Sequence, residues 1–397
     1  MKRDGKVLFY MRYVLAAVCV LIIGVLIYCS VNGKKEKQNT ADAPAETQAK
    51  QEGTEKPLET EKREDTESLW DTEQPLNAEG ETDADEEETG TTLIFAGDLI
   101  YGSTFCTNYD TEGMTRVVSE ELLKEMNDAD ITMVNEEFPF STRGVPMEDK
   151  QYTFRADPSY VESFHEMGID IVALANNHTL DYGKDALYDT FMTLDDAGIL
   201  YAGAGDSVER ASELQLIEVN GKKFGFLAAS RVLPVVEWNV ENSVPGALST
   251  YDETRLIQAI EEADSQCDVL TVYVHWGVEM QEYPEDYQRN LAAAYIEAGA
   301  DVVIGSHPHV LQGVEYIDGK PVFYSLGNFI STANKDKTML VKLTVDAENE
   351  IMAQIVPAVT KDGQTRKMNE LEQQVLNDYM ESISYGVTID GNGVIER

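Results

Sequence analysis

Five short apolar runs of the chain each end in side chains that can bind a metal or transfer a proton. The runs LIFA, ITMV, IVALA, VLTVYV and DVVIG are followed, in that order, by Gly97-Asp98, Asn135-Glu136-Glu137, Asn176-Asn177-His178, His275-Trp276-Gly277 and Ser306-His307-Pro308-His309. Because ligands of open α/β sheets bind at the carboxyl ends of the strands, we expect these segments to converge on one crevice. Four of the five histidines belong to this set. The fifth, His165, falls on a predicted helix over 160–167, where a solvated role is expected.

The fragments differ in how much each one indicates by itself. Asp98 after a glycine is common in turns, and His275 alone is as compatible with a buried structural histidine as with a ligand. The segment that ends at His178 is more specific, because asparagines are common in turns but a histidine after them at a strand end is not. The pair His307 and His309 is the most specific, since side chains at i and i+2 after a strand can face the same side.

A donor set of oxygen and imidazole without a thiolate suits Mn, Fe or Zn. It is less typical of Mg or Ca, whose sites are built from oxygen ligands. About seven such donors are too many for one four-coordinate ion, so we expect two divalent metal ions. A pair about 3.5–4 Å apart would bind a phosphate and activate a hydroxide, as in two-metal hydrolases. The departing alcohol would then need a proton, which a histidine beside the metals can supply.

Strands must alternate with helices to bring these side chains to one edge. Apolar residues recur with helical spacing over 117–126, 184–197, 252–263 and 285–298, and FGFLAA joins the five apolar runs as a predicted strand. This alternation predicts an α/β fold with parallel strands buried on both faces. The end of the chain changes character, with strand-like arms around an Asp318-Gly319 turn over 314–323 and further arms over 339–345 and 351–359.

The sequence before this region divides into an anchor and a linker. An uncharged apolar run over 13–31 is long enough to cross a bilayer. A cleaved signal peptide and a lipoprotein signal are alternatives, but no A-x-A site closes the run, and the bulky Tyr28 precedes Cys29. We therefore expect residues 1–32 to form a tail and an uncleaved transmembrane anchor, residues 33–90 a disordered acidic linker, and residues 91–397 the functional domain. Lysines flank the apolar run on both sides, so charge alone does not orient it.

The composition excludes several classes of protein. A formal net charge of −41 repels phosphate backbones and anionic lipid headgroups, which argues against nucleic acid as a partner. Four cysteines are too few for a disulfide framework or a cysteine-rich zinc module. We expect Cys106 and Cys267 to be plain thiols, with one disulfide between them as the alternative in an exported domain.

Eight segments that occur in one order carry a resemblance to a known family. They are FAGDLIYG, NEEFPF, YTFRADP, LANNHTLDYG, GILYAGAG, VHWGVE, GSHPHVLQG and YSLGNFI, and the resemblance covers residues 93–330. Together they resemble the bacterial capsule-synthesis protein CapA family, the poly-γ-glutamate capsule proteins. The resemblance implies a fold similar to that of calcineurin-like metallophosphoesterases, a four-layer α/β/β/α sandwich with a dinuclear metal site. It also implies that the arms from residue 339 onward lie in the second sheet of the sandwich.

The resemblance assigns roles to individual residues. The implied residues are Asp98 and His309 for a first metal, Asn177, His275 and His307 for a second metal, Glu137 as the shared carboxylate, and His178 as the general acid. The chain departs from the phosphoesterase pattern at Ile100, where a histidine is usual, so the first metal loses one donor. The usual Asp-Gly of the second motif is replaced as well, by Asn135-Glu136-Glu137, so Glu136 remains an alternative to Glu137.

The resemblance also implies a cellular role. It implies a single-pass protein of the cell membrane, with its N-terminus inside and its C-terminal domain outside. The protein would act in poly-γ-glutamate capsule synthesis or export, beside membrane-bound synthesis partners. Because the domain is acidic, binding of an anionic polymer needs the metals or local polar groups, for which Arg155, Arg231 and Asn328 are the candidates. Two hypotheses stay open: a metal-dependent hydrolase with His178 as the acid, and a non-catalytic subunit that binds or guides polymer in the same pocket.

Overall fold

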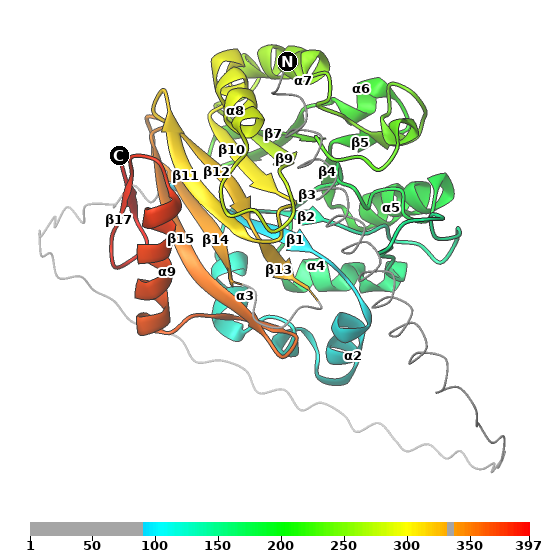
Figure 1. Cartoon of the computed structure of the whole chain (residues 1–397), viewed down its shortest axis with the longest axis horizontal. Helices are drawn as coiled ribbons and strands as arrows, with labels where there is room; N and C mark the ends of the chain where they lie inside the picture. Colours follow the sequence, from blue (N-terminus) through cyan, green and yellow to red (C-terminus); the bar gives the residue numbers. More distant parts are fainter. Residues whose placement is uncertain (1–89, 332–336) are drawn as a thin grey trace, which may run out of the picture. The chain divides into compact units, whose positions relative to one another are not determined.

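The computed structural model describes residues 90–331 and 337–397 (Figure 1). The chain divides into two units, Met1–Glu81 and Thr82–Arg397, and the described residues all belong to the second unit. The predicted anchor over 13–31, and the predicted linker apart from Gly90, lie outside the described residues. Within the described ranges, none of the helices is both long enough and apolar enough to cross a membrane.

The first sheet contains the strand that carries the predicted run LIFA. Its strands are, in spatial order, β16 (Gln364–Lys367), β15 (Ile351–Lys361), β14 (Lys337–Val345), β1 (Thr91–Leu99), β2 (Ile131–Glu136), β3 (Ile171–Ala173) and β4 (Leu200–Ala202). Strands β1 to β4 are parallel, whereas β14, β15 and β16 pair in the antiparallel sense. A short strand, β13 (Asn328–Ile330), pairs in parallel with the end of β1.

The second sheet carries the later apolar runs. Its strands are, in spatial order, β11 (Leu311–Ile317), β12 (Lys320–Leu326), β10 (Val302–Ser306), β9 (Val269–His275), β7 (Lys222–Ser230) and β6 (Gln215–Val219). Strands β7, β9, β10 and β12 are parallel, and β6 and β11 are antiparallel at the edges. Two small pairs complete the strands of the described residues, namely β5 (Ala204–Gly205) with β8 (Gly246–Ala247) and β17 (Thr388–Ile389) with β18 (Ile395–Glu396).

The helices cover the sheets and complete the cores (Figure 1). They are α2 (Ser103–Glu112), α3 (Glu120–Asn127), α4 (Glu162–Glu166), α5 (Lys184–Ala197), α6 (Val208–Ala211), α7 (Thr254–Asp264), α8 (Asp286–Ala298) and α9 (Glu370–Ile383), with 3₁₀ turns at Met114–Arg116, Pro158–Val161 and Val236–Trp238. Helix α9 packs against β11 and β15. The remaining long helices pack on the faces of the two sheets, where their apolar side chains take part in the cores.

Apolar side chains of the described residues gather in three cores. Side chains of both sheets share the first core, in which Phe95 of β1 and Ile304 of β10 take part. Because successive strand residues face opposite sides, Ile94 belongs to a second core with residues of α2, α3, α4 and α5. The third core joins Val303 of β10 to residues of α7 and α8. Strands buried on both faces explain the uninterrupted apolar runs in the sequence.

The predicted α/β class is confirmed, and the predicted elements are largely recovered. The helix expected over 184–197 has those bounds as α5, and the hairpin around Asp318-Gly319 is formed by β11 and β12. Helix α3 begins at Glu120 rather than at Val117, because the backbone of Val117 accepts a hydrogen bond from Thr365 instead. His165 is exposed on α4 as predicted, and Cys106 and Cys267 are free thiols.

The expectation that the arms over 339–345 and 351–359 lie in the second sheet is wrong. These arms are β14 and β15, and β14 pairs antiparallel with β1, so that Leu93 lies opposite Leu343. Both residues are buried in the core between the sheets. The alternation of apolar residues predicts the strands correctly but carries no information about which strand edge each one joins.

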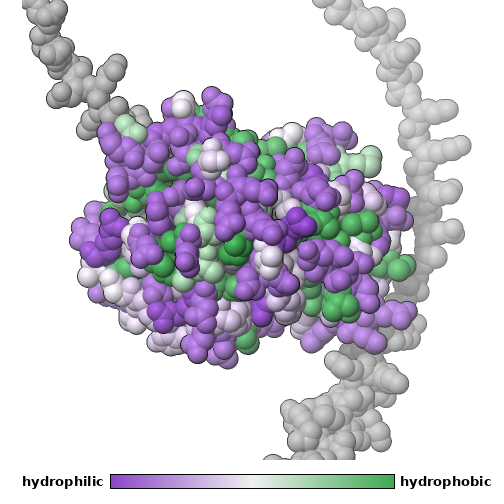
Figure 2. All heavy atoms as spheres, turned by 90° about the horizontal axis from the view of Figure 1, so that it is seen from above, coloured by the Kyte–Doolittle hydropathy of each residue, from purple (hydrophilic) through white to green (hydrophobic). Residues whose placement is uncertain are grey.

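The surface of the described residues is mostly hydrophilic, as Figure 2 shows for one face. Hydrophobic residues interrupt it in separate places rather than as a continuous band on that face. The three most exposed large apolar side chains, Val145, Val236 and Leu371, come from separate parts of the chain. Such scattered exposure is normal for a folded domain.

Gly97 allows β1 to approach the chain that follows β12. A Cβ at this position would lie 1.9 Å from the carbonyl oxygen of Gly327, and the amide of Asp98 donates to that same oxygen at 3.1 Å. We therefore expect Gly97→Ala to lower the free energy of unfolding by about 1–3 kcal/mol, measured by urea denaturation. Gly391→Ala is the control, because its Cβ would meet nothing within 4 Å. Equal effects of the two substitutions would contradict this prediction.

Candidate metal centre

The described residues contain two groups of side chains whose donor atoms lie close enough to hold a metal ion. The His275 group is Glu137, His275 and His307, and the Asp98 group is Asp98, Glu137 and His309. The donor atoms within each group lie within 4.8 Å of one another. They come from the ends of β1, β2, β9 and β10, so strand ends of both sheets meet at one place. The structure thus brings together five of the predicted donors, and their roles as ligands stay predictions.

The His275 group has the spacing of ligands around one ion. Nε2 of His275 lies 3.0 Å from Nδ1 of His307 and 3.8 Å from Oε1 of Glu137. Asn177, the fourth predicted donor here, brings Oδ1 to 2.6 Å from the same Nε2. Ligand atoms bound at about 2.1 Å stand about 3.0 Å apart at right angles and about 3.4 Å apart at the tetrahedral angle. The four donors are spaced around these values.

In the Asp98 group, one oxygen of the Asp98 carboxylate accepts a hydrogen bond, and the other oxygen faces a histidine. Nδ2 of Asn135 donates to Oδ1 of Asp98 at 2.7 Å, and the other carboxylate oxygen, Oδ2, lies 3.5 Å from Nδ1 of His309. Nδ1 of His309 also lies 2.8 Å from Oδ1 of Asn328. Ile100, which stands where a further donor was expected from the resemblance, is buried and offers only hydrocarbon.

Glu137 is shared by the two groups. Its side chain is fully buried, and neither carboxylate oxygen has a hydrogen-bond partner among the described residues. Burial, reinforced by the negative charge of Asp98, raises the pKa of Glu137 well above its usual range. A buried carboxylate without partners is costly unless a cation neutralises it, so a divalent metal ion fits this donor set.

The neighbouring Glu136 belongs to neither group. Its oxygens are also buried and lack hydrogen-bond partners in the part of the chain that the structure describes, and burial raises its pKa. Burial, with a smaller contribution from Glu136, raises the pKa of Tyr101, which packs in the core on the helix-covered face of the first sheet. Successive strand residues face opposite sides, and the preceding Asn135 contacts Asp98. This arrangement favours Glu137 as the ligand.

Three polar side chains hold the donors in position. Besides its bond to Asp98, Asn135 brings Nδ2 to 3.3 Å from Nδ1 of His275, and Oγ of Ser306 lies 3.0 Å from the same nitrogen. Asn176 in turn donates to Oδ1 of Asn135 at 3.1 Å. Contacts of this kind fix the ring orientation of a ligating histidine. The sequence motifs contain all three residues, but they do not distinguish a supporting residue from a ligand.

His178 faces the shared carboxylate. Its Nε2 lies 3.8 Å from Oε1 of Glu137, and its Nδ1 lies 2.6 Å from Oδ2 of Asp181. The ring of Phe154 packs against the imidazole with centroids 4.4 Å apart. Asp181 thus orients the ring so that Nε2 points toward the donor groups. Sequence reasoning missed Asp181, although its position three residues after His178 inside a quoted motif was an available signal.

Lys150 was also missed, and it gave no signal because it reaches the site from a separate loop. Its ammonium group contacts Asp181, donates to the backbone carbonyl of Asn177, and lies 3.0 Å from Nδ1 of His178. Burial lowers its pKa, and the charge of Asp181 opposes this effect. Lys150 therefore ties its loop to the turn that carries the proposed acid.

We expect Lys150→Met to destabilise the protein by about 3 kcal/mol, because it leaves the buried carboxylate of Asp181 short of a cation. The side chains of the pair are 13% and 0% exposed. Lys124→Met is the matched control, since its partner is the exposed Asp128 and such pairs contribute little. Chemical denaturation of both variants measures the difference. If Lys150→Met lowered the free energy of unfolding no more than Lys124→Met, the buried pair would contribute no more to stability than the exposed pair.

The histidines differ in protonation. Burial lowers the pKa of His275 well below its usual range and lowers the pKa of His307 to about 4. Burial by itself would lower the pKa of His309 as well. The carboxylates of Asp98 and Glu137 outweigh this effect and raise the pKa of His309 to about 10. His275 and His307 are therefore neutral at pH 7, the form in which imidazole binds a metal. The same carboxylates would attract a metal ion, whose binding requires His309 to lose this proton.

The backbone at His307 and His309 adopts left-handed conformations, with φ of 99° and 59°. Strand β10 ends at Ser306, so these residues do not continue it. The two imidazoles do lie near each other, with ring centroids 5.7 Å apart, but positive φ angles rather than strand alternation orient them. Non-glycine residues in this region store strain, which is a frequent feature of functional sites.

The remaining predicted residues lie in different surroundings. The exposed Arg155 donates to the carbonyl of Arg143 at 2.8 Å and stacks on Tyr182. Arg231 lies at the end of β7, where its amide donates to the carbonyl of His275 at 2.8 Å. The structure therefore gives Arg155 no contact with the donor groups among the described residues, and its substrate-binding role stays a prediction. Asn328 lies against His309.

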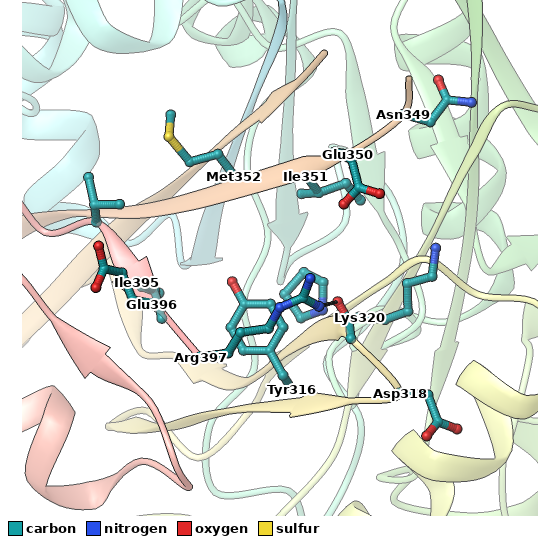
Figure 3. Close-up of a pocket in the computed structure, with 13 residues that line it drawn as sticks. Tyr316, Asp318, Lys320, Asn349, Glu350, Ile351, Met352, Ile395, Glu396 and Arg397 are labelled. Carbon is teal, nitrogen blue, oxygen red and sulfur yellow. Dashed lines mark hydrogen bonds between the residues drawn. The ribbon is translucent and has the colours of Figure 1, made fainter. Parts of the chain in front are cut away.

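A pocket of about 670 Å³ lies away from these donors (Figure 3). Its lining includes Tyr316 of β11, Lys320 of β12 and Arg397, whose guanidinium donates to the carbonyl of Gly319 at 2.8 Å. Lys320 begins β12, whereas Asn328 follows the end of that strand, so the pocket lies at the opposite end of β12. None of the predicted donors lines this pocket.

The class defined so far is an α/β protein whose strand ends bring together buried carboxylates and imidazoles that could hold a metal ion. Residues 92–333 match the family "Bacterial capsule synthesis protein PGA_cap". The chain is 30% identical over 295 residues to "Capsule biosynthesis protein CapA" of Bacillus anthracis, which covers 70% of this chain and 69% of the relative. The chain belongs to this family of bacterial capsule synthesis proteins, as the motifs predicted.

Two further similarities are narrower or weaker. "PGA biosynthesis protein CapA" of Bacillus subtilis is 34% identical over 183 residues, 46% of this chain and about half, 48%, of the relative. A hypothetical protein from Thermus thermophilus is similar in structure with a TM-score of 0.41 and 14% identity, over 67% of this chain and 99% of that one. This structural similarity is too weak to identify a shared fold.

Proposed function

We propose that the protein is a CapA-type accessory protein of poly-γ-glutamate capsule synthesis or export and that it acts through a metal-dependent, hydrolase-like site. The names of the two Bacillus relatives support the biological process. The observation that carries the proposed chemistry is Glu137, a buried carboxylate without hydrogen-bond partners among the described residues that belongs to both donor groups. Such a residue is suited to bridge two cations.

We infer that the domain has the four-layer α/β/β/α sandwich of metallophosphoesterases. Two sheets that share a core, each with helices packed on its other face, support this inference. The position of the donors at strand ends of both sheets supports it as well. The uncleaved anchor over 13–31 remains a proposal from the sequence alone.

The metals we propose are two divalent ions, chosen among Mn, Fe and Zn for their affinity for mixed oxygen and imidazole donors. The proposed ligands are Asp98 and His309 on one side, Asn177, His275 and His307 on the other, and Glu137 between them. Bound there, the ions would supply Lewis-acid polarisation of a substrate oxygen and would acidify water.

His178 is the proposed general acid. Its Nε2 faces the donor groups, and Asp181 accepts at Nδ1, so the imidazole is held with one nitrogen directed at the site of reaction. When the ring is protonated at both nitrogens, the Nε2 proton can pass to a leaving oxygen or nitrogen as the bond to it breaks, and Nδ1–H stays on Asp181. Burial lowers the pKa of His178, and the Asp181 carboxylate opposes this effect by favouring the protonated ring. Phe154 packs against the ring, and Lys150 contacts Asp181 and the same Nδ1 atom, so both help to keep the ring in this orientation.

The substrate we propose is a phosphoester or an amide-linked anionic polymer such as polyglutamate. The acidic domain repels such a polymer, so the metal ions are the main attraction, and Arg155 and Asn328 are proposed substrate contacts from the sequence. The membrane location, with the domain outside and membrane-bound synthesis partners, is proposed from the sequence and from the capsule-related names of the relatives.

A second function is supported by one departure. Ile100 removes a donor expected in the Asp98 group, which would weaken one of two metals. In that case the protein would be a non-catalytic subunit that binds polymer or acts as a scaffold in a membrane capsule-synthesis complex. This alternative predicts metal or polymer binding without hydrolysis.

The first test is the metal content of the full chain, purified without chelator and measured by mass spectrometry. We expect about two equivalents of Mn, Fe or Zn per chain and their loss in a His307→Ala/His309→Ala variant. The loaded protein is then assayed against phosphoesters and poly-γ-glutamate. About one equivalent without hydrolysis would favour the binding or scaffold function. Absence of metal, even after Mn or Zn is added, would refute the metal-dependent site.

A further inference from the structure

The two donor groups are unequal if only the predicted ligands are counted. The His275 group has four donors once Asn177 is included, and two of its contacts measure 2.6 and 3.0 Å. The Asp98 group has three, because Ile100 brings no donor atom. Three ligands leave a metal weakly held, so either this position is empty or another side chain completes it. The structure brings one candidate to the Asp98 group.

That candidate is Asn328, the first residue of β13. The strand pairs in parallel with the end of β1, and Asn328 lies directly opposite Asp98 in the register. The amide of Asp98 donates to the carbonyl of Gly327 at 3.1 Å, which fixes the two backbones to each other. The Asn328 side chain is buried, with 6% of its surface exposed. Its position is therefore set by the sheet rather than by a loop.

The side chains of Asn328 and Asp98 approach the same nitrogen atom of His309. Its Oδ1 lies 2.8 Å from Nδ1 of His309, and this same nitrogen lies 3.5 Å from Oδ2 of Asp98. These separations bracket the values of about 3.0 and 3.4 Å expected between ligand atoms that bind one ion at about 2.1 Å. They also resemble the His275 group, where Oδ1 of Asn177 lies beside Nε2 of His275.

We propose that Asn328 is a metal ligand whose Oδ1 completes the Asp98 group in place of the donor that Ile100 lacks. The inference rests on the proposed dinuclear site and deepens it. Each metal would then have the shared Glu137, at least one histidine and one asparagine oxygen. Amide oxygen is a suitable ligand for Mn, and a buried amide loses little on binding because it exchanges one hydrogen bond for a metal bond.

A competing role is that of a supporting hydrogen-bond acceptor. In that case His309 would bind the metal through Nε2 while Nδ1 donates to Asn328, as second-shell partners of ligating histidines do. Nδ1 of His309 faces Oδ2 of Asp98 at 3.5 Å as well as Asn328, so a metal bound through Nδ1 would have both oxygens beside it. The two roles differ in the distance between Oδ1 and the ion, which is directly measurable.

The decisive experiment is a crystal structure of the full chain loaded with Mn²⁺, with the ions located by anomalous scattering. We expect an ion bound by Asp98, Glu137 and His309 with Oδ1 of Asn328 at about 2.1–2.3 Å. An ion on these three residues with Oδ1 beyond about 3 Å would overturn the inference and leave the proposed function intact. Absence of any ion at Asp98 and Glu137 would refute the proposed site and the inference with it.

A binding measurement extends the test without relying on activity. We expect Asn328→Leu to weaken binding of one of the two Mn²⁺ equivalents by about tenfold or more, while Asn328→Asp retains both because it keeps an oxygen donor. Asn290→Leu, on the exposed surface of α8, is the matched control and should bind like the unmodified chain. Full retention of both equivalents in a folded Asn328→Leu variant would also overturn the inference.

Discussion

Exchange of Glu137 for glutamine should remove most of the bound metal. The substitution keeps the shape of the side chain but deletes the charge that both donor groups share. We expect both equivalents to weaken by about 100-fold or more, since the negative charge that both cations share is lost, a larger change than the 10–100-fold effect of a supporting residue. Mass spectrometry of the protein after dialysis against metal-free buffer measures the loss.

Glu136→Gln is the matched control for this prediction. Glu136 is adjacent, equally buried and equally without hydrogen-bond partners among the described residues, yet it belongs to neither donor group. Burial raises its pKa and so favours the protonated form, which glutamine imitates. Metal content should therefore stay unchanged. If Glu136→Gln lost metal while Glu137→Gln kept it, the assignment of the shared carboxylate would be reversed.

Replacement of His178 by alanine should abolish hydrolysis while metal binding persists. A positioned general acid contributes about 10²–10⁴-fold to a rate, so we expect a loss of that size in kcat against any substrate that the loaded protein hydrolyses. Asp181 keeps its contact with Lys150 in the variant, so the buried carboxylate is not left alone. Steady-state kinetics and metal content, measured on the same preparation, check both parts of the prediction.

His165→Ala is the control, because His165 is exposed on α4 and away from the donor groups. It should leave kcat and metal content unchanged. If His178→Ala kept the full rate, the general-acid assignment would be wrong. If the unmodified, metal-loaded chain hydrolysed none of the substrates tested, and capsule formation were unaffected by His178→Ala, the binding or scaffold function would be favoured instead.

The sequence by itself determined the fold class, most elements and the set of donors. Uninterrupted apolar runs predicted strands buried on both faces, and helical spacing predicted α5 with its observed bounds. The ligand-type residues at the end of each run are visible in the sequence, because each run and the residues that follow it form one continuous segment. Candidate donors such as the pair His307 and His309 could therefore be read from a single segment, whereas His275 needed the other segments beside it. The order of the motifs also identified the family.

Only the tertiary structure decided how these parts meet. The pairing of β14 with β1, rather than with the second sheet, depends on contacts between strands about 250 residues apart, which alternation does not encode. The choice of Glu137 over Glu136 depends on which face of β2 each side chain takes, and the orientation of His307 and His309 depends on positive φ angles outside any regular element.

The support around the site likewise came from distant segments. Lys150 reaches the turn of His178 from a separate loop, and Asn328 reaches His309 because β13 pairs with β1. Neither residue lies in a pattern that signals its neighbours, because the partners of a buried polar group are chosen by the fold rather than by sequence spacing. The sequence therefore named the candidate donors, and the packing of two sheets decided which of them lie close enough together to hold a metal.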